Sequence, residues 1–376
     1  MLIGDWRSRS LDDLLTEHDL AGLPEHEFPT DGWSGSRFTT IERGNERFVL
    51  KRTSPRVDWI VRATRDDRLR EAWMAACSAG PGSWIQLGGS LRLPSLGAAA
   101  DPADPDGAVI LMPDLSVELI AWERPGHEPA IDLDTLDRVV DAVALLHALP
   151  WSHSLTGQAE LTGEAPPPWC PLPERLTLLT PRSAAAYDAT GEPVGRIFLD
   201  GWAAFDRHAS AAARDLIREL SADVTPLVLA LQRLPAVGLH GDLKLANVAL
   251  PEDGSVAFID WQMTLQAPVA VELGWFLVTN HGELPIVPDE VLRRYRQSLG
   301  WYAGRWGHGA VPHDLDGLAG DWDAQVDLTA IVGLLLRGWR KGRDAEAGLT
   351  LPSGLTAAED LAWWCDRAVE AAARRL

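Results

Sequence analysis

Short runs of apolar residues between turns mark the first third of the chain. Residues 37–41 (Arg-Phe-Thr-Thr-Ile) and 47–51 (Arg-Phe-Val-Leu-Lys) flank a turn at Gly44-Asn45, and residues 108–112 form a third, wholly apolar run. Such runs predict strands. The stretch 57–77, rich in Arg, Asp, Glu and Ala, predicts a helix. The first part of the chain is therefore expected to be a small antiparallel sheet with one helix.

Helical spacing dominates the rest of the chain. Leu136, Val139, Val140, Val143 and Leu146 fall on one face of a helix. The proline-rich stretch 162–181 is expected to be irregular. Further helices are expected over 203–234, 288–299, 321–340 and 357–375. The pattern predicts an α+β fold with two lobes: residues 1–116 form an N-lobe with the sheet, and residues 117–376 form a mostly helical C-lobe.

One hairpin is expected between the helical blocks of the C-lobe. Residues 247–250 read as a strand, residues 251–254 (Pro-Glu-Asp-Gly) as a turn, and residues 255–259 as the returning strand. Antiparallel pairing would bring Asn247, at the start of the first strand, beside Asp260, which follows the second. An amide oxygen and a carboxylate placed together are suitable ligands for magnesium.

The composition of the chain disfavours some classes of binding partner. The chain has 54 Asp and Glu against 34 Lys and Arg, a net charge of −20, which disfavours binding to nucleic acid phosphates. No apolar run approaches the roughly 18–20 residues that a membrane helix needs, and residues 1–10 lack the features of a signal peptide. Cys77, Cys170 and Cys365 lie far apart, without the spacing of a zinc site. We expect a cytoplasmic protein without a membrane or nucleic acid partner; its oligomeric state stays open.

Lysine and asparagine are both scarce. Arginine supplies most positive charge, and the only lysines are Lys51, Lys244 and Lys341. A lysine kept in such a chain is a candidate for a place that needs a compact ammonium group. Lys341, among arginines near an expected helix end, is read as structural, where positive charge suits the helix dipole.

Two short segments carry a family resemblance. Residues 240–247 (His-Gly-Asp-Leu-Lys-Leu-Ala-Asn) and 259–261 (Ile-Asp-Trp) resemble the catalytic and metal loops of the aminoglycoside phosphotransferase-like superfamily of small-molecule kinases, of the APH and choline kinase type. The resemblance extends to Lys51, to Glu71 and to the helix end after His147, and runs from about residue 31 to 275. It implies a protein-kinase-like fold that uses ATP and Mg²⁺.

The resemblance implies a role for each matching residue. Asp242 would accept the proton of the acceptor hydroxyl, and Lys244 would touch the transferred phosphate. Asn247 and Asp260 would hold magnesium. The nucleotide-binding residues would be Lys51, Glu71, Gly32, Ser34, Gly35, Met112 and Asp114.

The chain also departs from the family pattern. The glycine loop is Gly32-x-x-Gly35, shorter than the full G-x-G-x-x-G. The family usually has an Asp before Leu to brace the catalytic loop; here Glu272 stands at that place, and whether the longer side chain braces the loop stays open. A protein kinase is disfavoured, because Gly241 replaces the expected Arg and Asp260-Trp261-Gln262 replaces Asp-Phe-Gly.

The predicted function is transfer of the γ-phosphate of ATP to a hydroxyl group of a small molecule that resembles an aminoglycoside, an amino alcohol or a sugar. The alternative is a catalytically silent nucleotide-binding regulator of the same fold. Asp242, Asn247, Asp260 and Lys51 are all present, which disfavours the alternative. The sequence leaves open the identity of the acceptor and the choice between ATP and GTP.

Overall fold

The computed structural model describes residues 4–28, 33–78, 90–120, 129–305 and 314–376. Contacts within the chain define two compact units. The first unit is Met1–Leu119 with Trp151–Cys170 and Ala249–Thr264, and the second is Ile120–Pro150 with Pro171–Val248 and Leu265–Leu376. A single division after residue 116 was expected, whereas here two later segments join the first 119 residues.

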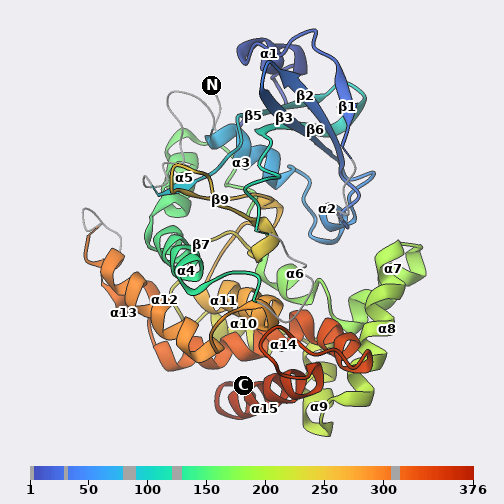
Figure 1. Ribbon diagram of the computed structural model, residues 1–376, viewed down its shortest axis with the longest axis vertical. Coiled ribbons are helices and arrows are strands. Elements are labelled where there is room, and N and C mark those ends of the chain that lie inside the picture. Colours follow the sequence, from blue (N-terminus) through green and yellow to red (C-terminus); the bar gives the residue numbers. More distant parts are fainter. Residues whose placement is uncertain (1–3, 29–32, 79–89, 121–128, 306–313) are drawn as a thin grey trace. The chain divides into compact units, whose positions relative to one another are not determined.

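The first unit is built on a five-stranded antiparallel sheet in the order β1-β2-β3-β6-β5 (Figure 1). Its strands are β1 (Glu25–Glu27), β2 (Arg37–Arg43), β3 (Glu46–Thr53), β5 (Gly97–Asp101) and β6 (Asp104–Pro113). The three strands predicted from the apolar runs are β2, β3 and β6. Lys51 is paired with Phe38 on one side and with Ile110 on the other, so it stands on a central strand.

Alternation along β3 decides where Lys51 points. Phe48 and Leu50 join a core with Leu11 and Leu14 of α1 (Leu11–Glu17). Because successive side chains of a strand point to opposite faces, Lys51 lies on the face away from that core. Helix α3 (Arg70–Ser78), which packs against β5 and β6, supplies its partner there.

The single helix expected over 57–77 is two helices, α2 (Trp59–Ala63) and α3. Asp58 caps α2 by accepting hydrogen bonds from the N–H groups of Ile60 and Val61. Between the helices, Arg65 and Leu69 have φ values of 52°, in the left-handed region that interrupts a helix. Local capping thus overrides the helical composition of this stretch.

The remaining elements of the first unit are short. They are β4 (Leu91–Arg92), α5 (Trp151–Thr162), β9 (Val256–Phe258) and η2 (Trp261–Met263). Strand β8 (Val248–Ala249) neighbours β9 in a three-stranded sheet with β4, and the turn between β8 and β9 closes with a 3.1 Å bond from Gly254 N–H to the Pro251 carbonyl. The predicted hairpin thus forms, although Asn247 lies in a 3₁₀ turn, η1 (Leu245–Asn247), and not in the strand.

The second unit is mostly helical. Its helices are α4 (Leu133–Ala148), α6 (Leu172–Thr177), α7 (Pro181–Thr190), α8 (Pro193–His208), α9 (Ala211–Ala222), α10 (Thr225–Leu231), α11 (Val269–Asn280), α12 (Pro288–Ala303), α13 (Leu315–Ala319), α14 (Trp322–Glu346) and α15 (Ala357–Arg375). A two-stranded sheet of β7 (Val237–Leu239) and β10 (Leu265–Ala267), with the 3₁₀ turn η3 (His281–Glu283), completes it. The fold class is α+β, as the sequence predicted.

Two sequence expectations in this unit were too coarse. The stretch 203–234 is the end of α8 followed by α9 and α10, since Ser210 caps α9 and Asp223 ends it. The proline-rich stretch 162–181 includes α6, which has a proline near its first turn.

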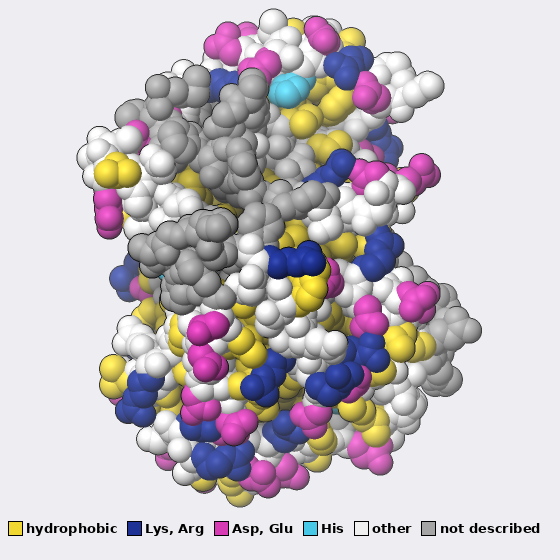
Figure 2. All heavy atoms as spheres, turned by 90° about the vertical axis from the view of Figure 1, so that its left-hand side faces the viewer, with side chains coloured by type: hydrophobic (Ala, Val, Ile, Leu, Met, Phe, Trp, Pro, Cys, Tyr) yellow, Lys and Arg dark blue, Asp and Glu magenta, His cyan; other side chains and the backbone are white. Residues whose placement is uncertain are grey.

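Charge is spread over the surface. Acidic and basic side chains are interspersed on the face shown in Figure 2, as expected of a diffuse net charge of −20. Within the described ranges, no helix has the length and apolar content needed to cross a membrane.

Glycines let the long helix α14 approach its neighbours closely. It packs against α8, α11 and α15 (Figure 1). A Cβ atom at Gly342 would lie 2.4 Å from the backbone nitrogen of Phe205 in α8, and one at Gly274 in α11 would lie 2.7 Å from the Thr329 carbonyl oxygen. Both contacts are with backbone, which cannot move aside as a flexible side chain could.

Gly342→Ala is expected to destabilise the protein by about 1–3 kcal/mol, because the added methyl group must separate α14 from α8. Gly300→Ala on α12 is the matched control, since its Cβ would meet only Leu315 Cδ2, at 3.9 Å. That change should stabilise by about 0.5–1 kcal/mol, the usual gain of Ala over Gly within a helix. Urea unfolding of both variants measures the effects, and equal effects would contradict the close-packing argument.

Candidate active site

Lys51 lies at the centre of a buried ion cluster in the first unit. Its Nζ atom is 2.6 Å from Glu71 Oε2 and 2.7 Å from Asp260 Oδ1. The side chains of Lys51 and Glu71 are only 5% and 7% exposed, while that of Asp260 is 25% exposed. The pair of Lys51 with Glu71 expected from the sequence is therefore present, and Asp260 joins it.

Two carboxylates share one ammonium group in this cluster. Burial alone would lower the pKa of Lys51, but the charges of Asp260 and Glu71 raise it above its ordinary value. Burial raises the pKa of Glu71, and the charge of Lys51 opposes that rise. Asp260, the most exposed of the three, is the carboxylate best placed to accept a second cation.

The backbone at Asp260 adopts an unusual conformation. Its φ and ψ are 66° and 62°, in the left-handed region, which is unfavourable for a residue with a side chain. Neighbouring bonds hold this turn: Trp261 Nε1 donates to the Phe258 carbonyl at 2.6 Å, and Arg70 donates to the Gln262 carbonyl at 2.6 Å. Two consecutive residues of α3 thus stabilise the cluster. Glu71 pairs with Lys51, and Arg70 holds the turn that carries Asp260.

The glycine loop is only partly described, because Gly32 lies outside the described residues. Gly35 has φ +93°, and a Cβ atom there would lie 2.2 Å from the Val57 carbonyl oxygen, so the position requires glycine. The Ser34 carbonyl accepts the N–H of Trp59 at 3.1 Å, and Ser36 Oγ donates to Asp58 at 2.9 Å. The described part of the loop is therefore fastened to the start of α2.

Met112 and Asp114 stand at the end of β6. Met112 pairs with Val49 in the sheet. The Asp114 N–H donates to the Arg47 carbonyl at 2.9 Å, and its carboxylate accepts bonds from Arg47 and Ser116. Since that carboxylate is already engaged, a ligand would meet the backbone of this stretch more readily than the Asp114 side chain.

Asp242 is the centre of a second cluster, in the second unit. Lys244 Nζ lies 3.0 Å from Asp242 Oδ2. Asn247 Nδ2 donates to the same oxygen at 3.1 Å and to the Asp242 carbonyl at 2.8 Å. Asp242, Lys244 and Asn247 thus lie together in one cluster, in which the carboxyl side chain of Asp242 is 12% exposed.

Glu272 of α11 holds the backbone that presents Asp242. Its carboxylate accepts N–H bonds from His240 at 2.6 Å, Gly241 at 3.0 Å and Leu243 at 3.4 Å. Glu272 is 1% exposed, and Gly241 takes a φ of 87°, which allows the loop to wrap around the carboxylate. The longer side chain found in place of Asp therefore does brace the loop.

Two buried rings support the charge of Glu272. Burial alone would raise the pKa of Glu272, but His147, the charge of His240 and the His240 N–H hold it below its ordinary value of 4.5. Burial raises the pKa of Tyr295 well above 10, and its hydroxyl shares a hydrogen bond of 2.7 Å with His147 Nδ1. The other ring nitrogen of His147, Nε2, lies 3.7 Å from Glu272.

Two further residues hold the same loop and were missed in the sequence. Arg175 of α6, 1% exposed, donates from Nε to the Gly241 carbonyl at 2.8 Å. Asn280 of α11 accepts the Leu245 N–H at 3.2 Å and donates to the Phe276 carbonyl at 2.7 Å. The rarity of asparagine could have marked Asn280, whereas nothing distinguishes Arg175 among so many arginines.

Lys341 corrects a sequence expectation. It is not at an exposed helix end but within α14, 8% exposed, where its ammonium group pairs with Asp360 of α15. Asp360 also contacts His281, the residue after Asn280. Each of the three lysines therefore pairs with at least one carboxylate, and Lys341 needs more than a positive charge.

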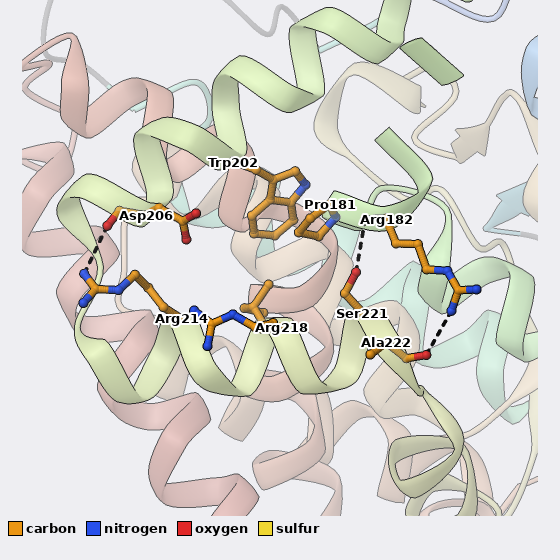
Figure 3. Close-up of a pocket in the computed structure, with 9 residues that line it drawn as sticks. Pro181, Arg182, Trp202, Asp206, Arg214, Arg218, Ser221 and Ala222 are labelled. Atoms are coloured by element: carbon orange, nitrogen blue, oxygen red, sulfur yellow. Dashed lines mark hydrogen bonds between the residues drawn. The ribbon is translucent and has the colours of Figure 1, made fainter. Parts of the chain in front are cut away.

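A separate hollow lies elsewhere in the second unit, among α7, α8 and α9 (Figure 3). It has a volume of about 470 Å³ and is lined by Pro181, Arg182, Trp202, Asp206, Arg214, Ile217, Arg218, Ser221 and Ala222. Arg182 donates to the Ala222 carbonyl at 3.1 Å and Arg214 to the Asp206 carbonyl at 3.0 Å. These two arginines thus donate hydrogen bonds to backbone carbonyls of residues that line the hollow. No residue of the catalytic loop is among its lining residues.

Comparison with known proteins identifies the family. Residues 25–309 match the sequence model of the phosphotransferase enzyme family, APH. This match covers more than half of the 376 residues, so the chain belongs to that family. It is a phosphotransferase, an enzyme that transfers a phosphoryl group to an acceptor hydroxyl.

Solved structures show weaker similarity. A thermostable mutant of aminoglycoside phosphotransferase APH(4)-Ia, in complex with ADP and hygromycin B, is 13% identical with a TM-score of 0.43, over 97% of this chain and 99% of that one. Choline kinase LicA from Streptococcus pneumoniae is 9% identical with a TM-score of 0.43, over 94% of each chain. Macrolide 2'-phosphotransferase MphH from Brachybacterium faecium is 18% identical with a TM-score of 0.35, over 93% and 97%. A search of curated proteins found no match.

Glu272→Gln is expected to destabilise the protein by about 2–3 kcal/mol at pH 7, because the amide NH₂ would face backbone donors. The folded-state pKa of Glu272 is lowered, so its contribution is present above the ordinary value of 4.5 and is lost as the pH falls through the folded value. The stability difference between wild type and variant should therefore shrink below about pH 4.5.

Urea unfolding between pH 3 and 7 measures this difference. Glu219→Gln, on the exposed face of α9, is the control and should leave the stability curve unchanged. A difference between wild type and Glu272→Gln that stayed constant across this range would show that the carboxylate charge does not hold the loop.

Proposed function

We propose that this enzyme transfers the γ-phosphoryl group of ATP to a hydroxyl group of a small molecule, with Asp242 as the base. The observation that carries the proposal is the Asp242 carboxylate, partly exposed on a loop that Glu272, Arg175 and Asn280 hold by its backbone. A base must meet the acceptor in a fixed position, and a loop anchored at Gly241 and Leu245 provides that.

Lys244 and Asn247 have complementary tasks at Asp242. Both donate to Oδ2, which leaves Oδ1 as the oxygen to accept the proton of the acceptor hydroxyl. The ammonium group of Lys244 lies 3.0 Å from Asp242, where it could neutralise charge on the transferred phosphoryl group.

The residues present fit a magnesium ion. Asn247 uses its amide nitrogen for Asp242, and its Oδ1 has no hydrogen-bond donor among the described residues, so an oxygen ligand is available. Asp260 supplies a carboxylate that pairs with the ammonium group of Lys51 at 2.7 Å and is 25% exposed. We propose Asn247 and Asp260 as the magnesium ligands; the ion would neutralise the phosphates of the nucleotide.

The remaining nucleotide contacts are proposed from the first unit. Lys51, oriented by Glu71, would bind the non-transferred phosphates. The loop at Gly32, Ser34 and Gly35 would cover the phosphates, and the backbone from Met112 to Asp114 would receive the base. GTP could use the same contacts, so both nucleotides belong in the assay.

Charge and cysteine chemistry support the proposed setting. The net charge of −20 disfavours binding to nucleic acid phosphates, and acidic and basic side chains are interspersed on the face shown in Figure 2. Cys77, Cys170 and Cys365 are buried and form no disulfide, which agrees with a reducing compartment. We propose a small-molecule acceptor and a cytoplasmic location.

Asp242→Asn tests the proposed function. The variant should lose about 10²–10⁴-fold in kcat while its affinity for MgATP stays within about twofold, because the amide keeps the shape but cannot accept a proton. Asp206→Asn on α8 is the control and should retain full turnover. The assay is phosphate transfer from ATP and from GTP to a panel of hydroxylated compounds, with nucleotide binding measured by calorimetry.

Normal turnover by Asp242→Asn would contradict the assignment of the base. Nucleotide binding by wild type, without transfer to any acceptor, would instead favour the silent regulator.

Lys51→Arg should lower kcat/KM at least about tenfold, equivalent to ~1.4 kcal/mol, because a planar guanidinium fits poorly between two close carboxylates. Lys341→Arg is a matched control, since Lys341 is also buried beside a carboxylate. It should lower the melting temperature yet leave kcat/KM unchanged. Equal losses of kcat/KM in the two variants would show that Lys51 acts only through stability.

Magnesium binding has its own test. Asp260→Asn should weaken magnesium-dependent binding of ATP more than Asn247→Ala does, since a carboxylate is the harder and more charged ligand. Titrations of ATP with and without magnesium measure this, and equal magnesium dependence in wild type and Asp260→Asn would remove Asp260 from the metal site.

A further inference from the structure

Arg337 of α14 is a partly buried arginine without a carboxylate partner. Its guanidinium lies 5.3 Å from the ring centroid of Trp275 and 5.3 Å from that of Trp339. Among the described residues it has no hydrogen bond and no ion pair. The next cations along the same helix differ, since Arg340 pairs with Asp344 at 3.0 Å and Lys341 pairs with Asp360.

Arg337 lies close to the catalytic loop within the second unit. Trp275, whose ring Arg337 faces, also carries the guanidinium of Arg175 at 4.8 Å. Arg175 in turn donates to the carbonyl of Gly241, the residue before Asp242. Two side chains, Arg175 and Trp275, thus connect the loop to Arg337.

Arg337 remains charged at neutral pH. Burial and the like charge of Arg340 lower its pKa to about 10, whereas the charges of Asp344 and Asp242 oppose that change. A pKa of about 10 still leaves the guanidinium protonated at pH 7.

A purely structural role explains this arrangement poorly. The chain has 54 acidic residues, so a partner carboxylate would be easy to supply, as it is for Arg340 and Lys341. The tryptophan rings hold the guanidinium by cation–π attraction, which does not use its N–H donors. Those donors can therefore bind a group from outside the protein, and a guanidinium suits the paired oxygens of a carboxylate or phosphate.

We propose that Arg337 binds an anionic group of the acceptor, so that the enzyme prefers hydroxylated acids or sugar phosphates to acceptors rich in ammonium groups. This inference rests on the proposed function, because it takes Asp242 as the place where the acceptor hydroxyl lies. An acceptor carrying several ammonium groups would meet Arg337 and Lys244 together, and both repel it.

Five probes that share a six-carbon sugar skeleton and differ mainly in charge test the proposal: gluconate, sorbitol 6-phosphate, sorbitol, glucose and N-methylglucamine. Their dissociation constants are measured by calorimetry on the full chain with ADP and magnesium present. We expect gluconate or sorbitol 6-phosphate to bind at least tenfold more tightly than sorbitol and glucose, with N-methylglucamine weakest. The first two probes separate a carboxylate from a phosphate.

Variants then attribute the preference to Arg337. Arg337→Gln should abolish the advantage of the anionic probes, while Arg337→Lys should retain part of it. Arg340→Gln is the control, since Arg340 already has Asp344, and the order of the probes should not change. The proposal is overturned if N-methylglucamine binds best, if all probes bind alike, or if Arg337→Gln keeps the wild-type order.

The binding order is read without turnover, so it does not depend on catalysis. Absence of phosphate transfer would overturn the proposed function yet leave the order measurable. If Arg337→Gln failed to fold, the order on wild type and on Arg337→Lys would still decide. Equal losses of turnover with anionic, neutral and cationic acceptors in Arg337→Gln would place Arg337 at the phosphoryl group instead, which also overturns the proposal.

Discussion

The buried carboxylate of Glu272 is the interaction on which the catalytic loop depends. Three backbone N–H groups, those of His240, Gly241 and Leu243, donate to this one side chain, which is 1% exposed. A buried charge is tolerable only when it is fully hydrogen-bonded, so the loop and the carboxylate stabilise each other. His147, which is hydrogen-bonded to Tyr295, extends this dependence to α4 and α12. The position of Asp242 therefore depends on how the helices α4, α11 and α12 pack together.

Local pattern predicted much of the fold. The strands β2, β3 and β6 and the helices α4, α12 and α15 follow directly from apolar runs and helical spacing, because those signals lie within one element. The points at which a helix is interrupted were harder to predict from the sequence. The division of 57–77 depends on Asp58 as a cap and on the left-handed residues Arg65 and Leu69, which composition does not reveal. Lys341 was misread for a related reason, since only tertiary structure places Asp360 beside it.

The residues of the candidate site also fall into those that the sequence pointed to and those that only the structure revealed. Asp242, Lys244 and Asn247 belong to one short motif that the sequence singled out, and the Lys51–Glu71 pair followed from the family resemblance. Their roles in catalysis remain proposals. Arg175, Asn280 and Arg337 could not be found this way, because each acts through contacts with residues distant in the chain. The scarcity of lysine was expected to mark functional positions only. In the structure, each of the three lysines, including Lys341, pairs with a carboxylate.

The adjacency of Arg70 and Glu71 has a mechanical consequence. Neighbouring residues of one helix point in different directions, and here one reaches the β3 lysine while the other reaches the turn that carries Asp260. Helix α3 therefore makes two contacts with the ion cluster. A rotation of α3 that moved Glu71 away from Lys51 would also strain the hydrogen bond from Arg70 to the Gln262 carbonyl. A shift of α3 would therefore strain both the contact with the ammonium group and the contact with the left-handed turn.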